Sequence, residues 1–157
     1  MATTVSDAIK SYLEATGARY KIHSTRGPTM TAPDAARELH VPLSTIVKTI
    51  VFTDQDDRPL LAILTGDRRV DRGKLSAAAG ASRVRIASAE DTKKFTGFEV
   101  GTTPPLGHTQ TLRTVIDQTV MGFDKVYGGS GTTDALLEIS PRDLAMLTNA
   151  KIADICE

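Results

Sequence analysis

The clearest strand signal in this sequence is the run Ile46-Val47-Lys48-Thr49-Ile50-Val51-Phe52-Thr53. Most of its residues are β-branched, and such side chains pack well on the pleated surface of a sheet. A polar stretch over residues 54–58 and a second apolar run over residues 60–64 follow it. The sequence therefore predicts an antiparallel β-hairpin at residues 46–64.

Lys48 is the one charged residue inside this apolar run. Because side chains of a strand alternate between faces, Lys48 shares a face with Ile46 and Ile50. An ammonium among buried positions is costly unless it is paired or opens into a cleft. One interpretation is an edge-strand lysine that guards against aggregation. The other is an ammonium at the floor of a cleft, where it fixes a phosphate or a carbonyl.

Helical and extended patterns alternate on both sides of the hairpin. Helices are expected between Ser6 and Gly17 and at residues 31–39, 71–79, 88–95 and 142–147, with a short helical turn at 42–44. Further strands are expected at residues 19–23, 83–86, 112–116, 123–127 and 136–139. We expect a mixed α/β (α+β) fold, in which helices surround one mixed, largely antiparallel sheet in a single domain of residues 1–157.

Composition limits the classes of partner. The 157 residues are 40% hydrophobic and 24% charged, and 19 basic residues balance 19 acidic ones. A neutral chain does not bind polyanions in bulk, so any contact with nucleic acid must come from a local patch. The best local patch for the phosphates of a nucleic acid contains four cations, Arg68, Arg69, Arg72 and Lys74, although a mixed charge run of this kind is usually a solvated surface. With no signal peptide pattern and no long apolar run, we expect a cytoplasmic protein without a membrane or DNA partner.

Two glycine-rich segments are candidates for ligand binding. Residues 96–108 contain three glycines and two prolines, which predicts a stiff loop with backbone groups open to a ligand, or a plain structural connection. Residues 128–133 follow a strand, and their amides could cradle an anion or form a simple hairpin turn.

Metal chemistry and serine nucleophiles are not indicated. His23, His40 and His108 lack the spacing of metal ligands, and the single Cys156 excludes a cysteine-rich site. His108 follows the glycine- and proline-rich loop and is the better site candidate, while His23 could line the same cleft. No Gly-x-Ser-x-Gly motif is present.

In this order, the segments resemble the YbaK/ProX family of free-standing aminoacyl-tRNA deacylases, relatives of the editing domain of bacterial prolyl-tRNA synthetase. The resemblance runs from about Tyr20 to Ile155. Its most specific part is the pairing of the Val47-Lys48-Thr49 strand with a Gly-x-x-x-Pro loop at residues 101–105. It also includes residues 35–39, 64–67, 74–75, 96–98, 115–117 and 128–130, and Leu144.

The resemblance implies a pocket for the 3′-terminal adenosine of tRNA and its ester-linked amino acid. It implies that Lys48 is the required lysine and that the backbone from Gly101 to Pro105 positions the ester and the water, without a metal or organic cofactor. The expected substrate is a tRNA, tRNA-Pro or another, that carries a small non-cognate amino acid. An aminoacyl-tRNA synthetase is a further candidate partner. The predicted substrate contacts are His23, Met30, Thr31, Thr103, Leu106, Gly107, His108, Gly129 and Ser130.

The alternative function is a non-catalytic homologue that binds tRNA or a nucleotide. The presence of both Lys48 and the Gly101–Pro105 motif argues against it. A purely structural protein would leave the lysine inside an apolar strand unexplained.

Overall fold

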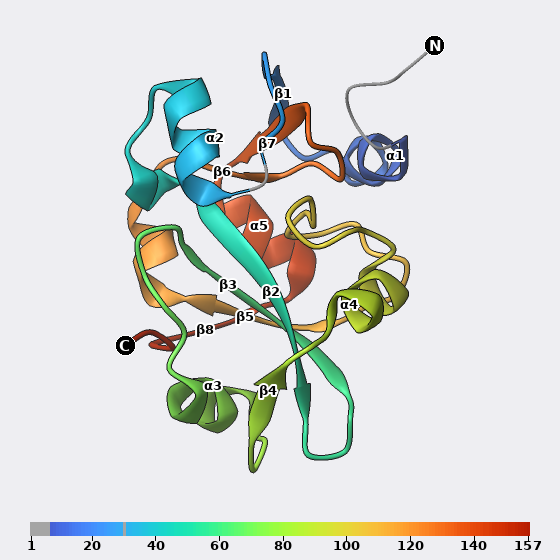
Figure 1. The fold of residues 1–157 in the computed structure, drawn as a ribbon, viewed down its shortest axis with the longest axis vertical. Helices are drawn as coiled ribbons and strands as arrows, with labels where there is room; N and C mark the ends of the chain where they lie inside the picture. The colour runs from blue at the N-terminus through green and yellow to red at the C-terminus, as the bar shows by residue number, and fades with distance from the viewer. Residues whose placement is uncertain (1–6, 30) are drawn as a thin grey trace.

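The computed structural model describes residues 7–29 and 31–157. Figure 1 shows their helices packed around two sheets. The helices are α1 (Asp7–Thr16), α2 (Ala32–Leu39), α3 (Arg72–Ala79), α4 (Ala89–Thr96) and α5 (Pro141–Thr148), with 3₁₀ turns η1 (Leu43–Thr45) and η2 (Gln118–Gly122). The strands are β1 (Tyr20–Ser24), β2 (Val47–Asp54), β3 (Pro59–Thr65), β4 (Val84–Ile86), β5 (Arg113–Asp117), β6 (Val126–Gly129), β7 (Ala135–Ile139) and β8 (Lys151–Ala153).

The larger sheet has the strand order β4-β2-β3-β5-β8. β2 and β3 pair antiparallel from Val47↔Thr65 to Thr53↔Pro59, so the predicted hairpin is confirmed. β5 joins β3 in parallel, and β8 joins β5 in parallel. On the other side, β4 pairs with β2 only from Phe52 to Asp54. In the described part of the chain, the edge of β2 at residues 48–50 is therefore open on that side.

The smaller sheet is antiparallel, in the order β1-β7-β6. The expected fold class is confirmed, but the strands form two sheets where one was expected. A single parallel bridge between Ile46 and Tyr127 joins them. Beyond this bridge, β2 pairs with β3, and β6 pairs with β7. The two strands do not pair further with each other, so the sheets remain separate.

Local signals located the helix starts correctly. The side chains of Thr31, Ser88 and Ser140 each accept a hydrogen bond from the backbone N–H three residues later, as N-caps do. Asp71 caps α3 in the same way. The helix was expected to begin at Asp71, but its first residue is Arg72. The expected cap at Ser6 lies outside the described residues.

One strand prediction near the end of the chain needs correction. The strand expected at residues 123–127 lies at Val126–Gly129, because its two glycines are strand residues and not part of a turn. The turn η2 and strand β8 were not expected. β8 has three residues, of which Lys151 and Ile152 are exposed, so it carries no alternating pattern to detect.

The glycine pair of β6 allows the loop at residues 101–105 to pack directly on the strand. A Cβ atom added to Gly129 would lie 2.5 Å from the carbonyl oxygen of Thr103 and 2.7 Å from that of Thr102. A Cβ on Gly128 would lie 2.9 Å from Cγ2 of Val47. The backbone N–H of Gly131 also donates to the carbonyl of Thr102 at 2.9 Å. The glycines therefore let the loop pack on β6 and let β6 lie close to Val47 of β2.

We predict that Gly129→Ala lowers the free energy of unfolding by ~1–3 kcal/mol, because the added methyl group would overlap backbone oxygens that cannot rotate away. Denaturant unfolding followed by circular dichroism measures this loss. Gly122→Ala is the matched control, since a Cβ at Gly122 meets nothing within 4 Å. Equal stability of the two variants would show that the loop does not depend on this contact.

Candidate functional site

A cavity of about 400 Å³ lies between the open edge of β2, helix α2, β6 and the loop that follows α4. Residues 46–50 form one wall, and Gly128 and Gly129 form another. Several of the predicted site residues line the cavity, namely Thr31, Lys48, Gly101, Thr103 and Gly129.

Lys48 is half-buried at the open edge of β2. Its ammonium donates a hydrogen bond to the backbone carbonyl of Arg68. Burial lowers the pKa of Lys48 below its ordinary value, because desolvation disfavours the charged form. Since a lysine ammonium has three donors, two remain for a ligand in the cavity.

Thr49 presents polar groups next to Lys48. The carbonyl of Val51 accepts from the N–H of Ala87 on the β4 side of the strand. Alternate residues of a strand direct their backbone groups to the same side, so the N–H and C=O of Thr49 face the open edge. Its hydroxyl oxygen is buried and has no hydrogen-bond partner among residues 7–29 and 31–157. The cavity therefore has unused donors and acceptors beside the ammonium.

The loop that begins at Gly101 is stiff. Gly101 has φ +89°, a left-handed conformation that favours glycine. The hydroxyls of Thr102 and Thr103 donate to the carbonyl of Glu99 at 2.9 and 3.1 Å. Pro105 is buried against β6, where its Cδ would lie 3.6 Å from a Cβ on Gly128. Gly101 and Thr103 thus line the cavity. Pro105, at the end of the loop, packs against β6 and is not a lining residue.

Two other predicted substrate contacts are engaged elsewhere in the small sheet. The imidazole of His23 pairs with Glu138 at 2.9 Å and lies edge-on to the ring of Tyr127. The hydroxyl of Ser130 is buried and donates to the carbonyl of Ala135 at 2.7 Å. Neither side chain lines the cavity that contains Lys48.

The residues after Pro105 turn away from this cavity. Leu106 is 1% exposed within the core, and a Cβ on Gly107 would lie 2.6 Å from the Ile9 side chain. His108 hydrogen-bonds to the carbonyl of Pro104 at 2.7 Å, and burial lowers its pKa. The structure places these three residues around a separate hollow beside Tyr12, and they are not among the residues that line the cavity at Lys48. Met30 lies outside the described residues.

Part of the wall was not foreseen from the sequence. It consists of small and apolar side chains from α2, β2 and β7, namely Ala32, Pro33, Ala35, Ile46, Ile50 and Leu136. The available signal was the run of small residues directly after Thr31, since a helix with short side chains leaves room beside the strand that it covers.

The predicted cationic patch begins beside Lys48. The guanidinium of Arg68 lies 3.8 Å from a carboxylate oxygen of Asp117. The ammonium of Lys74 donates to the carboxylate of Asp154 at 3.0 Å and to the carbonyl of Cys156 at 2.8 Å. Arg69 and Arg72 are exposed, and neither guanidinium has a salt-bridge partner in the described part of the chain. Arg69 and Arg72 are therefore the two members of the patch that remain available to phosphates.

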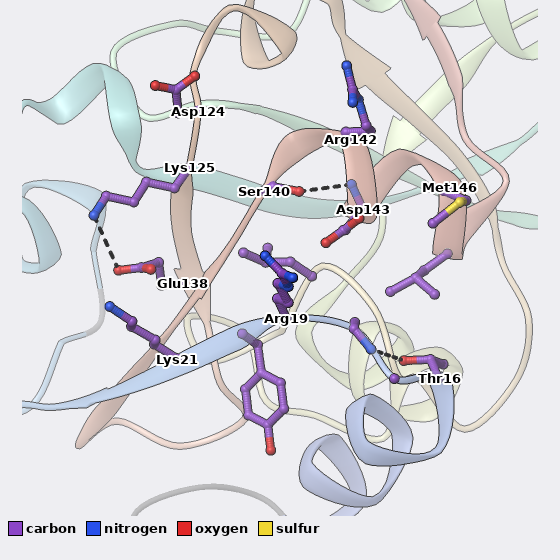
Figure 2. Close-up of a pocket in the computed structure, with 15 residues that line it drawn as sticks. Thr16, Arg19, Lys21, Asp124, Lys125, Glu138, Ser140, Arg142, Asp143 and Met146 are labelled. Atoms are coloured by element: carbon purple, nitrogen blue, oxygen red, sulfur yellow. Dashed lines mark hydrogen bonds and ion pairs between the residues drawn. The ribbon is translucent and has the colours of Figure 1, made fainter.

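A second cavity, of about 650 Å³, lies between the end of α1, β1, β7 and the start of α5 (Figure 2). Both basic and acidic side chains line it, and the ammonium of Lys125 lies 3.9 Å from a carboxylate oxygen of Glu138. It includes neither Lys48 nor any residue of the 101–105 loop. The smaller cavity, which combines an ammonium with open backbone groups, is the better candidate for chemistry.

Residues 7–29 and 31–157 contain no group of three or more His, Cys, Asp or Glu side chains that could hold a metal ion. None of their helices has the length and apolar character to span a bilayer.

Known proteins resemble this chain in sequence and in fold. The model of the aminoacyl-tRNA editing domain family matches residues 26–147. A solved structure described as "a putative trans-editing enzyme for prolyl tRNA synthetase" is 31% identical, with a TM-score of 0.87, and the match covers 98% of this chain and 99% of that one.

Two relatives are similar in sequence. "Putative Cys-tRNA(Pro)/Cys-tRNA(Cys) deacylase EbsC" of Enterococcus faecalis is 25% identical over 126 residues, 80% of this chain and 77% of the relative. The proline–tRNA ligase of Lactobacillus gasseri is 35% identical over 99 residues, which are 63% of this chain and only 17% of the ligase. These findings confirm the resemblance, and the chain belongs to the aminoacyl-tRNA editing domain family.

Proposed function

We propose that this protein hydrolyses the ester of mischarged tRNA in trans, releasing a small non-cognate amino acid. The observation that carries the proposal is that Lys48 and the stiff loop at Gly101 and Thr103 line one cavity. Its volume of about 400 Å³ falls within the range of about 300–1,000 Å³ typical of small-molecule sites. The proposal implies a cytoplasmic location, where aminoacyl-tRNA is used.

The chemistry requires no side-chain nucleophile. The oxygen of a water molecule attacks the ester carbonyl carbon, and the bond to the ribose oxygen breaks. The ribose oxygen receives a proton, so the products are the free amino acid and tRNA with its 3′ end restored. Because the neighbouring ribose hydroxyl already activates the ester, positioning of the water and stabilisation of the developing oxyanion supply much of the acceleration.

Different residues of the cavity have different roles in this reaction. Backbone groups of the 101–103 segment position the ester and the water, and they need no reorganisation because the loop is fixed on β6. Lys48 either neutralises negative charge near the ester or anchors the terminal nucleotide. Partial exclusion of water strengthens both effects, since charges interact more strongly at low dielectric.

Selection of small amino acids fits the wall formed by α2. Ala32, Pro33 and Ala35 leave a limited space beside β2. One methylene in an apolar pocket discriminates by only ~1–3 kcal/mol, so a separate site that excludes the larger, correct amino acid improves fidelity. The names of two relatives mention prolyl-tRNA synthetase or tRNA-Pro. They support tRNA-Pro as the substrate and a synthetase as a docking partner.

The decisive test is a panel of tRNAs, including tRNA-Pro charged with alanine, serine, threonine, cysteine or proline. We expect release of at least one small amino acid, while Pro-tRNA-Pro stays intact. Lys48→Ala should lower kcat/KM by at least ~100-fold, the size of effect seen when one oxyanion-stabilising group is removed. Circular dichroism should show that the variant remains folded.

Lys10→Ala is the matched control, because Lys10 is an exposed lysine on α1 away from the cavity. It should hydrolyse at the wild-type rate. Full activity of Lys48→Ala would refute the role of the ammonium. Binding of tRNA without hydrolysis of any member of the panel would favour the non-catalytic homologue instead.

The two exposed arginines of the cationic patch provide a separate prediction. Arg69→Glu and Arg72→Glu should raise the KM for full-length aminoacyl-tRNA, on the order of tenfold together, and reduce the salt dependence of binding. Hydrolysis of an aminoacylated CCA trinucleotide should change little, since this substrate lacks the acceptor-stem phosphates. Steady-state kinetics at several salt concentrations measures both effects. If both substrates are affected equally, these arginines do not contact the stem.

A further inference from the structure

The residue whose carbonyl accepts from Lys48 also has its guanidinium beside a buried carboxylate. Arg68 supplies this carbonyl, and its guanidinium lies 3.8 Å from the carboxylate of Asp117, the last residue of β5. The side chain of Asp117 is fully buried, whereas that of Arg68 is 35% exposed. A path of direct contacts therefore runs from the floor of the large sheet to the ammonium in the cavity.

Asp117 is firmly fixed. One carboxylate oxygen accepts from the N–H of Ile155 at 2.9 Å. The other accepts from the N–H of Thr119 at 3.1 Å and from the hydroxyl of the same residue. Burial by itself would raise the pKa of Asp117, but the hydrogen bonds from Thr119, Ile155 and Cys156 bring it below its ordinary value. The carboxylate is thus charged at neutral pH and can hold the Arg68 guanidinium.

The residues that follow Arg68 are fixed from the other side. The N–H of Asp71 donates to the carbonyl of Ile155 at 2.8 Å, and the N–H of Glu157 donates to the carbonyl of Arg69 at 3.0 Å. Val70 and Cys156 form an antiparallel bridge between these contacts. Asp117 therefore acts on the 68–71 segment in two ways. It lies beside the Arg68 guanidinium, and it binds the N–H of Ile155, whose carbonyl accepts from Asp71.

We infer that Asp117 is a positioning residue for Lys48, acting through Arg68 and the pairing of residues 69–71 with 155–157. The lysine stem has four rotatable bonds, and its ammonium must point into the cavity to meet a substrate. A fixed carbonyl restricts the ammonium to one place and leaves two of its three protons free. The kinetic part of this inference rests on the proposed function, whereas the contact between Lys48 and Arg68 does not.

A purely structural role for Asp117 is the competing explanation, and the chain contains a matched control for it. Asp54 is a second buried carboxylate of the same sheet, 6% exposed. It accepts from the N–H groups of Asp56 and Arg58 at 2.9 and 3.0 Å, and from Arg113 at 2.8 Å. It lies at the far end of β2 from Lys48 and does not line the cavity.

The experiment compares Asp117→Asn with Asp54→Asn. We expect both substitutions to lower thermal stability, because each weakens a buried charge pair. Only Asp117→Asn should lower kcat for the susceptible aminoacyl-tRNA, by about 10- to 100-fold, with KM changed less than about twofold, because small displacements of a catalytic group cost this much. In ¹H–¹⁵N spectra of the lysine NζH₃ groups, the Lys48 protons should exchange faster with water in Asp117→Asn and remain slow in Asp54→Asn.

An unchanged Lys48 signal in Asp117→Asn would overturn the inference, as would an equal loss of kcat in both variants. If Asp117→Asn does not fold, Arg68→Met replaces it, since this variant keeps the carbonyl and removes the ion pair. Because Arg68→Met leaves the pairing of residues 69–71 with 155–157 intact, an unchanged Lys48 signal in this variant would overturn positioning through the Arg68 guanidinium, the direct route from Asp117. If the wild-type protein hydrolyses no aminoacyl-tRNA, the proposed function fails, but the Lys48 signals still decide the positioning role.

Discussion

The structure depends on how one strand accommodates an ammonium among apolar residues. Lys48 belongs to a strand whose neighbours fill the core, and withdrawing its charge from water is costly. The cost is limited because β4 pairs only with the last three residues of β2, which leaves the edge beside Lys48 open to a cavity. The carbonyl of Arg68 then satisfies one of its donors. The same opening that makes the lysine tolerable also gives a ligand access to it.

Backbone contacts, more than side chains, shape the rest of the site. Gly128 and Gly129 let the 101–105 loop rest on β6 at distances that a Cβ would forbid. The threonines of that loop bind the carbonyl of Glu99 and so complete its internal bonding. A rigid backbone is suited to an ester that is already activated, because orientation and electrostatic stabilisation are then the main requirements.

Local patterns predicted the local features of the fold well. The hairpin at residues 46–64 and the caps at Thr31, Ser88 and Ser140 follow from signals within a few residues. The division into two sheets and strand β8 depend on long-range pairing, which no short pattern encodes. At the site, the lysine inside an apolar strand indicated a cleft, and Lys48 is among the residues that line the cavity. Sequence proximity suggested Leu106 and His108 as well, but they lie around a separate hollow, because the chain enters the core at Pro105. The catalytic roles of Lys48 and Gly101 stay predictions.

The most direct test is a crystal structure with a stable analogue of the substrate, an adenosine that carries alanine through an amide at its 3′ position. The account predicts that this analogue occupies the cavity beside β2, with its carbonyl between the Lys48 ammonium and the backbone of Gly101 to Thr103. An analogue bound only in the larger cavity between α1 and α5, or with its carbonyl directed away from Lys48, would contradict it.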